Sequence, residues 1–175
     1  GLDLVEFILD FNDVEENPLL KLGGIDEINS VIKSTGISVN TICADYFMEA
    51  PLHSSDDKVA DSSFKILERL IKTASLLKIT DIVIPCVDQS SLEDKEAVFR
   101  FVKQIDKIIP TIEKENINLS LETDLAPNSF LKLLNRINSK NVTVNYDIGN
   151  SAALGYDALE ELNAYGDRIT DIHIK

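Results

Sequence analysis

The sequence contains no tryptophan, one methionine, two histidines and two cysteines among its 175 residues. Cys43 and Cys86 are too few and too far apart for a disulfide framework or a zinc ribbon, so we expect free thiols in a reducing cytoplasm. No apolar run approaches the roughly 20 residues that cross a bilayer, and no charged-then-apolar leader opens the chain. These absences predict a soluble, cytoplasmic protein with no membrane partner.

Basic residues are also scarce, because 17 lysines and arginines stand against 30 aspartates and glutamates, which gives a formal net charge of −13. An acidic surface repels phosphate backbones, so we expect no nucleic-acid partner, although a local basic pocket could still take a small phosphorylated ligand. Neither a G-x-G-x-x-G turn nor a Walker lysine loop is present. The sequence therefore lacks the usual signatures of dinucleotide and nucleoside-triphosphate sites.

The apolar segments that are present alternate between strand-like and helix-like patterns. Strands are expected at residues 2–9, 38–43, 79–86, 117–122, 142–147 and 169–175, and helices at 25–34, 62–78, 91–109, 128–138 and 158–165. The strand segments are continuous apolar runs, which is typical of a parallel sheet covered by helices. No linker or low-complexity segment interrupts the pattern, so we predict a single domain over residues 1–175.

Local signals refine two of these segments. Ser91, with Asp94 three residues later, resembles a capping box, although that motif prefers glutamate or glutamine at its second position. Pro110 is expected to kink or split the helix that follows, because proline lacks a backbone donor and its ring clashes with the preceding turn. The stretch 44–56 is expected to be an irregular loop, and long loops over strand ends are often functional.

Three expected strands end in side chains that can bind metals. Glu122, Asp147 and His173 are separated by 25 and 26 residues, about one strand-helix repeat, so they should lie on neighbouring strands and face one opening. Two carboxylates and an imidazole suit Mn²⁺, Mg²⁺, Co²⁺ or Zn²⁺. Each residue also has a plainer interpretation: Glu122 could cap a helix or pair with a lysine, Asp147 could form an Asx turn, and His173 could be a core histidine.

An open doubly wound sheet and a (β/α) barrel both fit the alternation of strands and helices. A doubly wound nucleotide-binding protein usually carries a glycine-rich turn after its first strand, and this sequence has none. Polar groups at the carboxyl ends of several different strands are typical of a barrel, whose active sites collect at that rim. The pattern of site residues therefore favours the barrel.

Several motifs carry a family resemblance. The chain resembles the sugar-phosphate isomerase/epimerase branch of the xylose-isomerase-like TIM barrels, a superfamily that includes AP endonuclease 2, through runs near both ends: Gly1–Glu6, Leu119–Glu122, Tyr146–Asn150, Gly155–Asp157, Tyr165–Ile169 and Ile172–Lys175. The resemblance implies a (β/α)8 TIM barrel, of which the six strands here correspond to the second through the seventh. It also implies a further glutamate on the eighth strand, beyond Lys175, as fourth metal ligand and second acid/base, so we expect the chain to be a fragment of a longer protein.

The same resemblance implies a metal-dependent enzyme that acts on a sugar or sugar phosphate. The expected reaction is that of a ketose 3-epimerase or an aldose-ketose isomerase, in which a proton is taken from the carbon beside a carbonyl through a metal-stabilised enediolate. Glu122 would be both ligand and catalytic base, with Asp147 and His173 as the other ligands and Mn²⁺ as the first expectation for the metal. A homo-oligomer, dimer or tetramer, is also implied.

Four further residues are candidates for substrate contacts. Glu6 and Asp88 lie near expected strand ends, where each could contact the substrate or complete a surface turn. Asn150 could bond a sugar hydroxyl or cap a helix. His53, in the loop 44–56 with Tyr46 and Phe47, could wall the pocket or belong to the packing.

Alternative functions within this superfamily differ in how well the sequence fits them. An AP endonuclease is disfavoured, because its metal cluster uses more histidines than His53 and His173, and because the net charge opposes DNA. Inosose dehydratase and hydroxypyruvate isomerase chemistry use the same metal logic and stay open, as does a sugar-binding relative without turnover. The identity of the sugar and its phosphorylation are not fixed by these residues.

Overall fold

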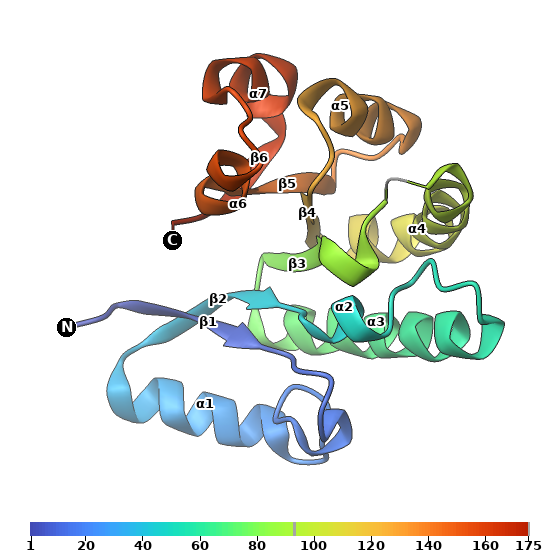
Figure 1. Cartoon of the computed structure of the whole chain (residues 1–175). Coiled ribbons are helices and arrows are strands. Elements are labelled where there is room, and N and C mark those ends of the chain that lie inside the picture. Colours follow the sequence, from blue (N-terminus) through green and yellow to red (C-terminus); the bar gives the residue numbers. More distant parts are fainter. Residues whose placement is uncertain (93, 175) are drawn as a thin grey trace.

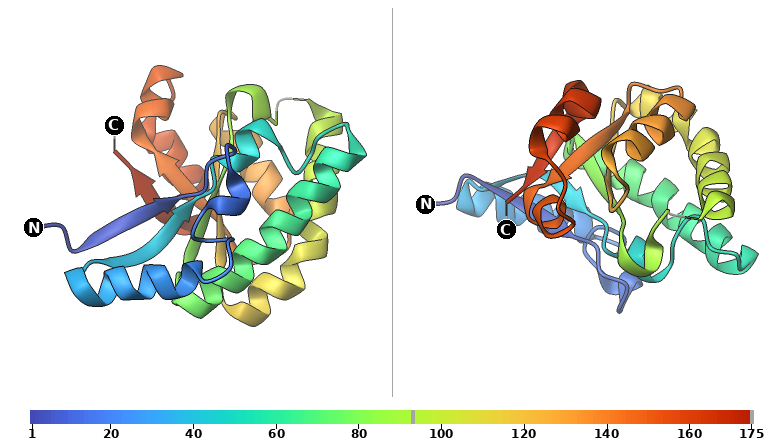
Figure 2. Two further views of the ribbon diagram at one scale, coloured as in Figure 1. Left: turned by 90° about the horizontal axis from the view of Figure 1, so that it is seen from below. Right: turned by 45° about the horizontal axis from the view of Figure 1, so that its top comes forward.

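The computed structural model of the chain describes residues 1–92 and 94–174, and within them six parallel strands form one sheet in the order β1-β2-β3-β4-β5-β6. The sheet is strongly curled and its helices lie on the outer side (Figures 1 and 2). An open doubly wound sheet reverses its strand order at a switch point, whereas a barrel adds each strand beside the last. The predicted barrel topology is therefore confirmed. The strands are β1 Leu4–Ile8, β2 Ser38–Cys43, β3 Asp81–Cys86, β4 Asn118–Thr123, β5 Val142–Asp147 and β6 Ile169–His173.

The connections between strands are mainly helical. Within the described part of the chain, no helix is both long and apolar enough to cross a membrane. The α-helices are α1 Gly24–Thr35, α2 Tyr46–Glu49, α3 Asp57–Leu77, α4 Lys95–Glu115, α5 Pro127–Arg136, α6 Ile148–Ala153 and α7 Ala158–Tyr165, and short 3-10 turns occur at η1 Val14–Glu16, η2 Asp88–Ser90 and η3 Gly166–Arg168.

Two helix starts differ from the expected ones because an aspartate caps each helix. Asp56 accepts a hydrogen bond from the Lys58 backbone N–H at 2.8 Å, so α3 begins before residue 62. Asp94 accepts from the Glu96 backbone N–H at 3.2 Å and is itself the cap of α4. The expected capping box that begins at Ser91 is therefore wrong, and the Ser91 hydroxyl instead donates to Asp124 Oδ1 at 2.8 Å.

Pro110 does not split α4, which continues to Glu115. The carbonyl that loses its helical partner is that of Asp106, and both residues are exposed, so water can satisfy it. Buried isoleucines on the opposite side of the helix continue without interruption through this turn: Ile105, Ile108 and Ile112. The burial of this stripe offsets the lost backbone hydrogen bond.

The two faces of the sheet differ in chemistry. The outer face packs against the helices and forms the apolar core, with Leu67, Leu70 and Ile71 of α3 buried against the strands. The inner face carries hydroxyls: Ser120 Oγ lies 2.9 Å from Thr143 Oγ1 and 2.9 Å from Thr170 Oγ1. Because β4 and β6 are not neighbours in the sheet, the contact between Ser120 and Thr170 shows how tightly the sheet curls.

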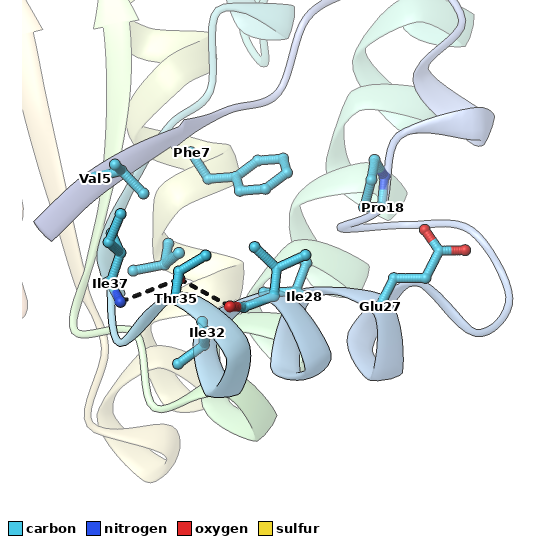
Figure 3. Close-up of a pocket in the computed structure, with 10 residues that line it drawn as sticks. Val5, Phe7, Pro18, Glu27, Ile28, Ile32, Thr35 and Ile37 are labelled. Carbon is cyan, nitrogen blue, oxygen red and sulfur yellow. Dashed lines mark hydrogen bonds between the residues drawn. The ribbon is translucent and has the colours of Figure 1, made fainter.

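An apolar cavity of about 350 Å³ lies between α1 and β1 (Figure 3). Val5 and Phe7 line it from β1, and Ile28 and Ile32 line it from α1. Glu6 lies between Val5 and Phe7, and since successive strand residues point to opposite faces, its side chain points to the inside of the curl. The cavity is therefore on the outer face, separated by the sheet from the inner polar groups.

The apolar core between α3 and the sheet supplies a test of the fold. We expect Leu70→Ala, at a position that is 0% exposed, to lower the free energy of unfolding by about 2–5 kcal/mol through lost burial and a cavity. The control is Leu76→Ala on the same helix, where the side chain is 67% exposed and the change should be within about 0.5 kcal/mol. Urea unfolding measures both, and equal losses would contradict this packing.

Candidate metal centre

The structure brings Glu122, Asp147 and His173 together at the carboxyl ends of β4, β5 and β6. Each offers one ligand atom, and these atoms all lie within 4.8 Å of one another. Glu122 is 6% exposed and Asp147 is 3% exposed, while His173 is partly buried. Two carboxylates and an imidazole in so small a volume form a donor set that suits a divalent cation of the first transition row or Mg²⁺.

Asp147 ends β5 and also caps the short helix that follows. Its Oδ1 accepts a hydrogen bond from the Asn150 backbone N–H at 2.8 Å, which starts α6. The plainer interpretation of Asp147 as a turn-forming residue is therefore correct for this oxygen, and it does not compete with a place in the cluster. Capping fixes the carboxylate at the strand end, so that one residue both shapes the turn and faces the opening.

Two side-chain amides orient the Glu122 carboxylate. Asn150 Nδ2 donates to Glu122 Oε1 at 2.7 Å, and Asn145 Nδ2 donates to Glu122 Oε2 at 2.8 Å. Asn150 was expected to contact a sugar or cap a helix, and the structure places its amide on Glu122. Neutral donors of this kind fix the direction of a carboxylate without neutralising it.

Asn145 is a site residue that the sequence did not single out. It lies 3% exposed in the middle of an apolar strand, two residues before Asp147 and therefore on the same face. Its Nδ2 is also 3.0 Å from His173 Nδ1, so it contacts two members of the cluster. An amide inside an otherwise apolar strand was the available signal, because a buried polar group needs partners there.

Glu6 reaches the cluster from the far edge of the sheet. Its Oε2 lies 3.1 Å from His173 Nε2, although β1 and β6 are the two outermost strands of the sheet. His173 Nδ1 lies 3.5 Å from Glu122 Oε2. Hydrogen bonding to Glu122, and then to Glu6, raises the pKa of His173 to about 10. A proton on this ring and a divalent cation compete for the same nitrogen lone pair.

A β-bulge aims His173 into the cluster. In the pairing of β5 with β6, Val144 lies opposite Ile169 but Asn145 lies opposite Asp171, so β6 has one extra residue. Thr170 and His173 are an odd number of residues apart, and a regular strand would place them on opposite faces. Both nevertheless contact inner-face side chains, because the bulge resets the alternation between them.

Asp88 and His53 have different surroundings from the cluster. Asp88 is exposed in η2 with φ of 51°, and its carbonyl accepts from the Ser91 backbone N–H at 3.1 Å, as in a surface turn. His53 is buried, with its ring centroid 5.8 Å from that of Phe101, and its carbonyl accepts from Arg100 Nε at 2.8 Å. The contacts of His53 therefore lie in the helix layer, on α4.

The remaining residues of interest are mostly packed. Tyr46 and Phe47 of the loop 44–56 are buried in the short helix α2. Cys43 and Cys86 are free and buried, and burial raises the pKa of both thiols. Lys175, which belongs to the last of the family-like runs, lies outside the described residues.

The curled sheet of parallel strands, the outer helices and the polar cluster at the carboxyl ends of the strands define a protein of the (β/α) TIM-barrel class. The chain belongs to the xylose isomerase-like TIM barrel family, whose model matches residues 1–175. The expected family resemblance is thereby confirmed.

The chain is also similar in sequence to curated proteins and in fold to solved structures. A protein of Haemophilus influenzae named "Putative L-ribulose-5-phosphate 3-epimerase SgbU" is 30% identical over 154 residues, covering 83% of this chain and 53% of that protein. The L-ribulose-5-phosphate 3-epimerase UlaE of Salmonella paratyphi A is 26% identical, covering 100% of this chain and 64% of that protein. A structure of D-psicose 3-epimerase with D-tagatose from Clostridium cellulolyticum H10 has a TM-score of 0.79 at 17% identity, covering 99% and 63%. The chain thus spans about half to two thirds of the length of these relatives.

The burial of His53 makes stability depend on pH. Burial, and then the nearby charge of Arg100, lowers its pKa from 6.5 to about 4. Below pH 6.5 the unfolded chain binds a proton here that the folded protein does not bind until about pH 4, so stability falls as pH drops through this window. We expect His53→Leu to reduce this fall by about 1–3 kcal/mol in urea titrations at a series of pH values. An unchanged pH dependence would show that the imidazole titrates normally.

Proposed function

We propose that this chain carries the metal-binding and proton-abstracting residues of a sugar or sugar-phosphate isomerase/epimerase of the ketose 3-epimerase type. The observation that carries the proposal is the gathering of Glu122, Asp147 and His173 at one barrel rim, with the Glu122 carboxylate oriented by two amides. The names of the relatives support the reaction class, since one is named an L-ribulose-5-phosphate 3-epimerase and the other a putative one. The substrate class is accordingly a ketose or its terminal phosphate ester.

The donor set fits a divalent cation, with Glu122, Asp147 and His173 as its holders and Mn²⁺ as the proposed ion. Such an ion, when bound, polarises the ketose carbonyl and acidifies the adjacent C–H bond. Glu122 takes that proton on one carboxylate oxygen, and breaking the C–H bond leaves its electron pair on the carbon next to the carbonyl. Asn145 and Asn150 hold the base at a fixed angle, which limits the reorganisation needed when its charge changes.

Inversion at carbon requires that the proton returns from the opposite face of the sugar. Glu122 lies on β4 and would take the proton from the face of the sugar that points toward this strand. A second acid must therefore lie on the opposite face of the sugar. The family resemblance gives this role to a glutamate of a later strand. Within the described residues, Glu122 is the carboxylate that we propose as the first base.

Metal dependence and the role of Glu122 can be tested together. We expect the protein to exchange the C3 proton of L-ribulose 5-phosphate with solvent deuterium when Mn²⁺ is present, and to stop when EDTA removes the metal. Glu122→Gln should lower this rate by about 10²–10⁴-fold, because the amide cannot accept the proton. Glu96→Gln makes the same change of charge at an exposed position of α4 and should leave the exchange rate unaltered. Mass spectrometry of the sugar measures the exchange, and metal-independent exchange would refute the proposal.

The contacts of Asn145 predict a separate effect on metal affinity. Removing its amide by Asn145→Ala takes away a donor that orients Glu122 and a contact of His173. We expect the affinity for Mn²⁺ to fall about 10–100-fold, as for other groups that orient metal ligands. The electron paramagnetic resonance signal of free Mn²⁺ during titration reports this directly. Asn163→Ala, at an exposed position of α7, is the matched control, and equal affinities for the two variants would exclude an orienting role.

A further inference from the structure

One of the buried carboxylates outside the candidate metal centre lies on α7. Glu161 of α7 is 2% exposed. Among the described residues, three hydroxyls donate to it: Tyr146 at 2.9 Å, Ser151 at 2.8 Å and Tyr165 at 2.8 Å. Burying a carboxylate costs free energy unless hydrogen bonds replace its water, and these three hydroxyls supply such hydrogen bonds.

The donors to Glu161 bracket the segment that carries two site residues. Tyr146 lies on β5 immediately before Asp147, and Ser151 lies on α6 immediately after Asn150. One carboxylate therefore holds both ends of the turn 147–150. Burial and the hydrogen bond to Glu161 raise the pKa of both Tyr146 and Tyr165, so these hydroxyls stay protonated as donors.

The short helix α6 depends on such outside contacts for its position. It has six residues, includes Gly149, and buries none of its own residues, so neither length nor burial fixes it. The Ser151 hydroxyl ties it to Glu161 on one side. On the other side, Asn150 Nδ2 donates to Glu122 Oε1 at 2.7 Å. Any displacement of α6 therefore moves the amide that orients Glu122.

We propose that Glu161 is a positioning residue, which holds α6 through Tyr146 and Ser151 and so holds the Asn150 amide on Glu122. The inference rests on the proposed function, since it assigns a role toward the base of that reaction. Glu161 does not itself face the substrate, because it acts from the helix side of β5, where α7 packs. Loss of Glu161 should therefore lower the rate of proton abstraction more than the affinity for the substrate.

The test compares variants that keep or remove the acceptor. Glu161→Leu removes all three hydrogen bonds, and Ser151→Ala removes only the hydrogen bond to α6. Glu161→Gln has a side chain of the same shape and keeps one acceptor oxygen. Glu160→Leu, at the exposed neighbouring position on α7, is the control for charge and helix changes. The rate of each variant is measured with Mn²⁺ present, and circular dichroism verifies folding.

We expect kcat for exchange of the C3 proton of L-ribulose 5-phosphate to fall about 100-fold in Glu161→Leu and about tenfold in Ser151→Ala, with KM changed less than about threefold. The reason is that misplacing a base mainly slows the chemical step. Glu161→Gln should recover most of the rate, and Glu160→Leu should match the native protein. A second readout is the side-chain amide resonance of Asn150 in ¹⁵N-labelled protein with diamagnetic Mg²⁺ in place of Mn²⁺, and this resonance should shift in Glu161→Leu and Ser151→Ala.

Native kcat and an unmoved Asn150 resonance in Ser151→Ala would overturn the proposal, even if Glu161→Leu failed to fold. An equal loss of rate in Glu160→Leu would also overturn it, because the effect would then not pass through the buried carboxylate. If the native protein showed no metal-dependent exchange of the C3 proton, the proposed function would fail, whereas the resonance of Asn150 would still decide whether Glu161 positions that amide.

Discussion

The hydrogen bonds from Asn145 and Asn150 to the Glu122 carboxylate are the interactions on which the site depends. They fix the direction of a buried acid with neutral donors, which do not neutralise its charge. Hydrogen bonding to Glu122, and then to Glu6, raises the pKa of His173 to about 10, so its ring binds a proton strongly. A divalent ion that enters must therefore displace a proton, which links affinity for the ion to pH. Burial strengthens these electrostatic effects.

The barrel separates stability from chemistry by the two faces of its sheet. Outward side chains pack with the helices, where Leu70 and its neighbours are fully buried. Several inward side chains are polar, from the hydroxyls of Ser120 and Thr143 to the amide of Asn145 nearer the strand end. Alternation along the regular parts of each strand places successive residues on opposite faces, and the bulge in β6 is an exception. Changes to the outer packing can therefore alter stability while the inner polar arrangement is kept.

Much of this arrangement could be predicted from the sequence, since strand ends in a parallel barrel share one rim and the 25- and 26-residue intervals match one repeat. The contact between Glu6 and His173 could not, because it depends on how far the sheet curls. The role of Asn145 is not evident from the sequence, because its neighbours along the strand are mostly apolar. Its contacts in the fold, Glu122 and His173, are polar. Helix starts were misplaced where an aspartate, Asp56 or Asp94, captured a backbone N–H ahead of the apolar pattern.

The irregularity in β6 has a practical meaning for protein engineering. Because one additional residue restores His173 to the inner face, a transplant of this triad onto an idealised strand would turn the imidazole toward the helices. The strand of any recipient scaffold must therefore include the extra residue as well as the histidine. Sequence alignments that force this strand into a gapless match to a regular one would pair Ile172 with the position that His173 occupies and hide the similarity.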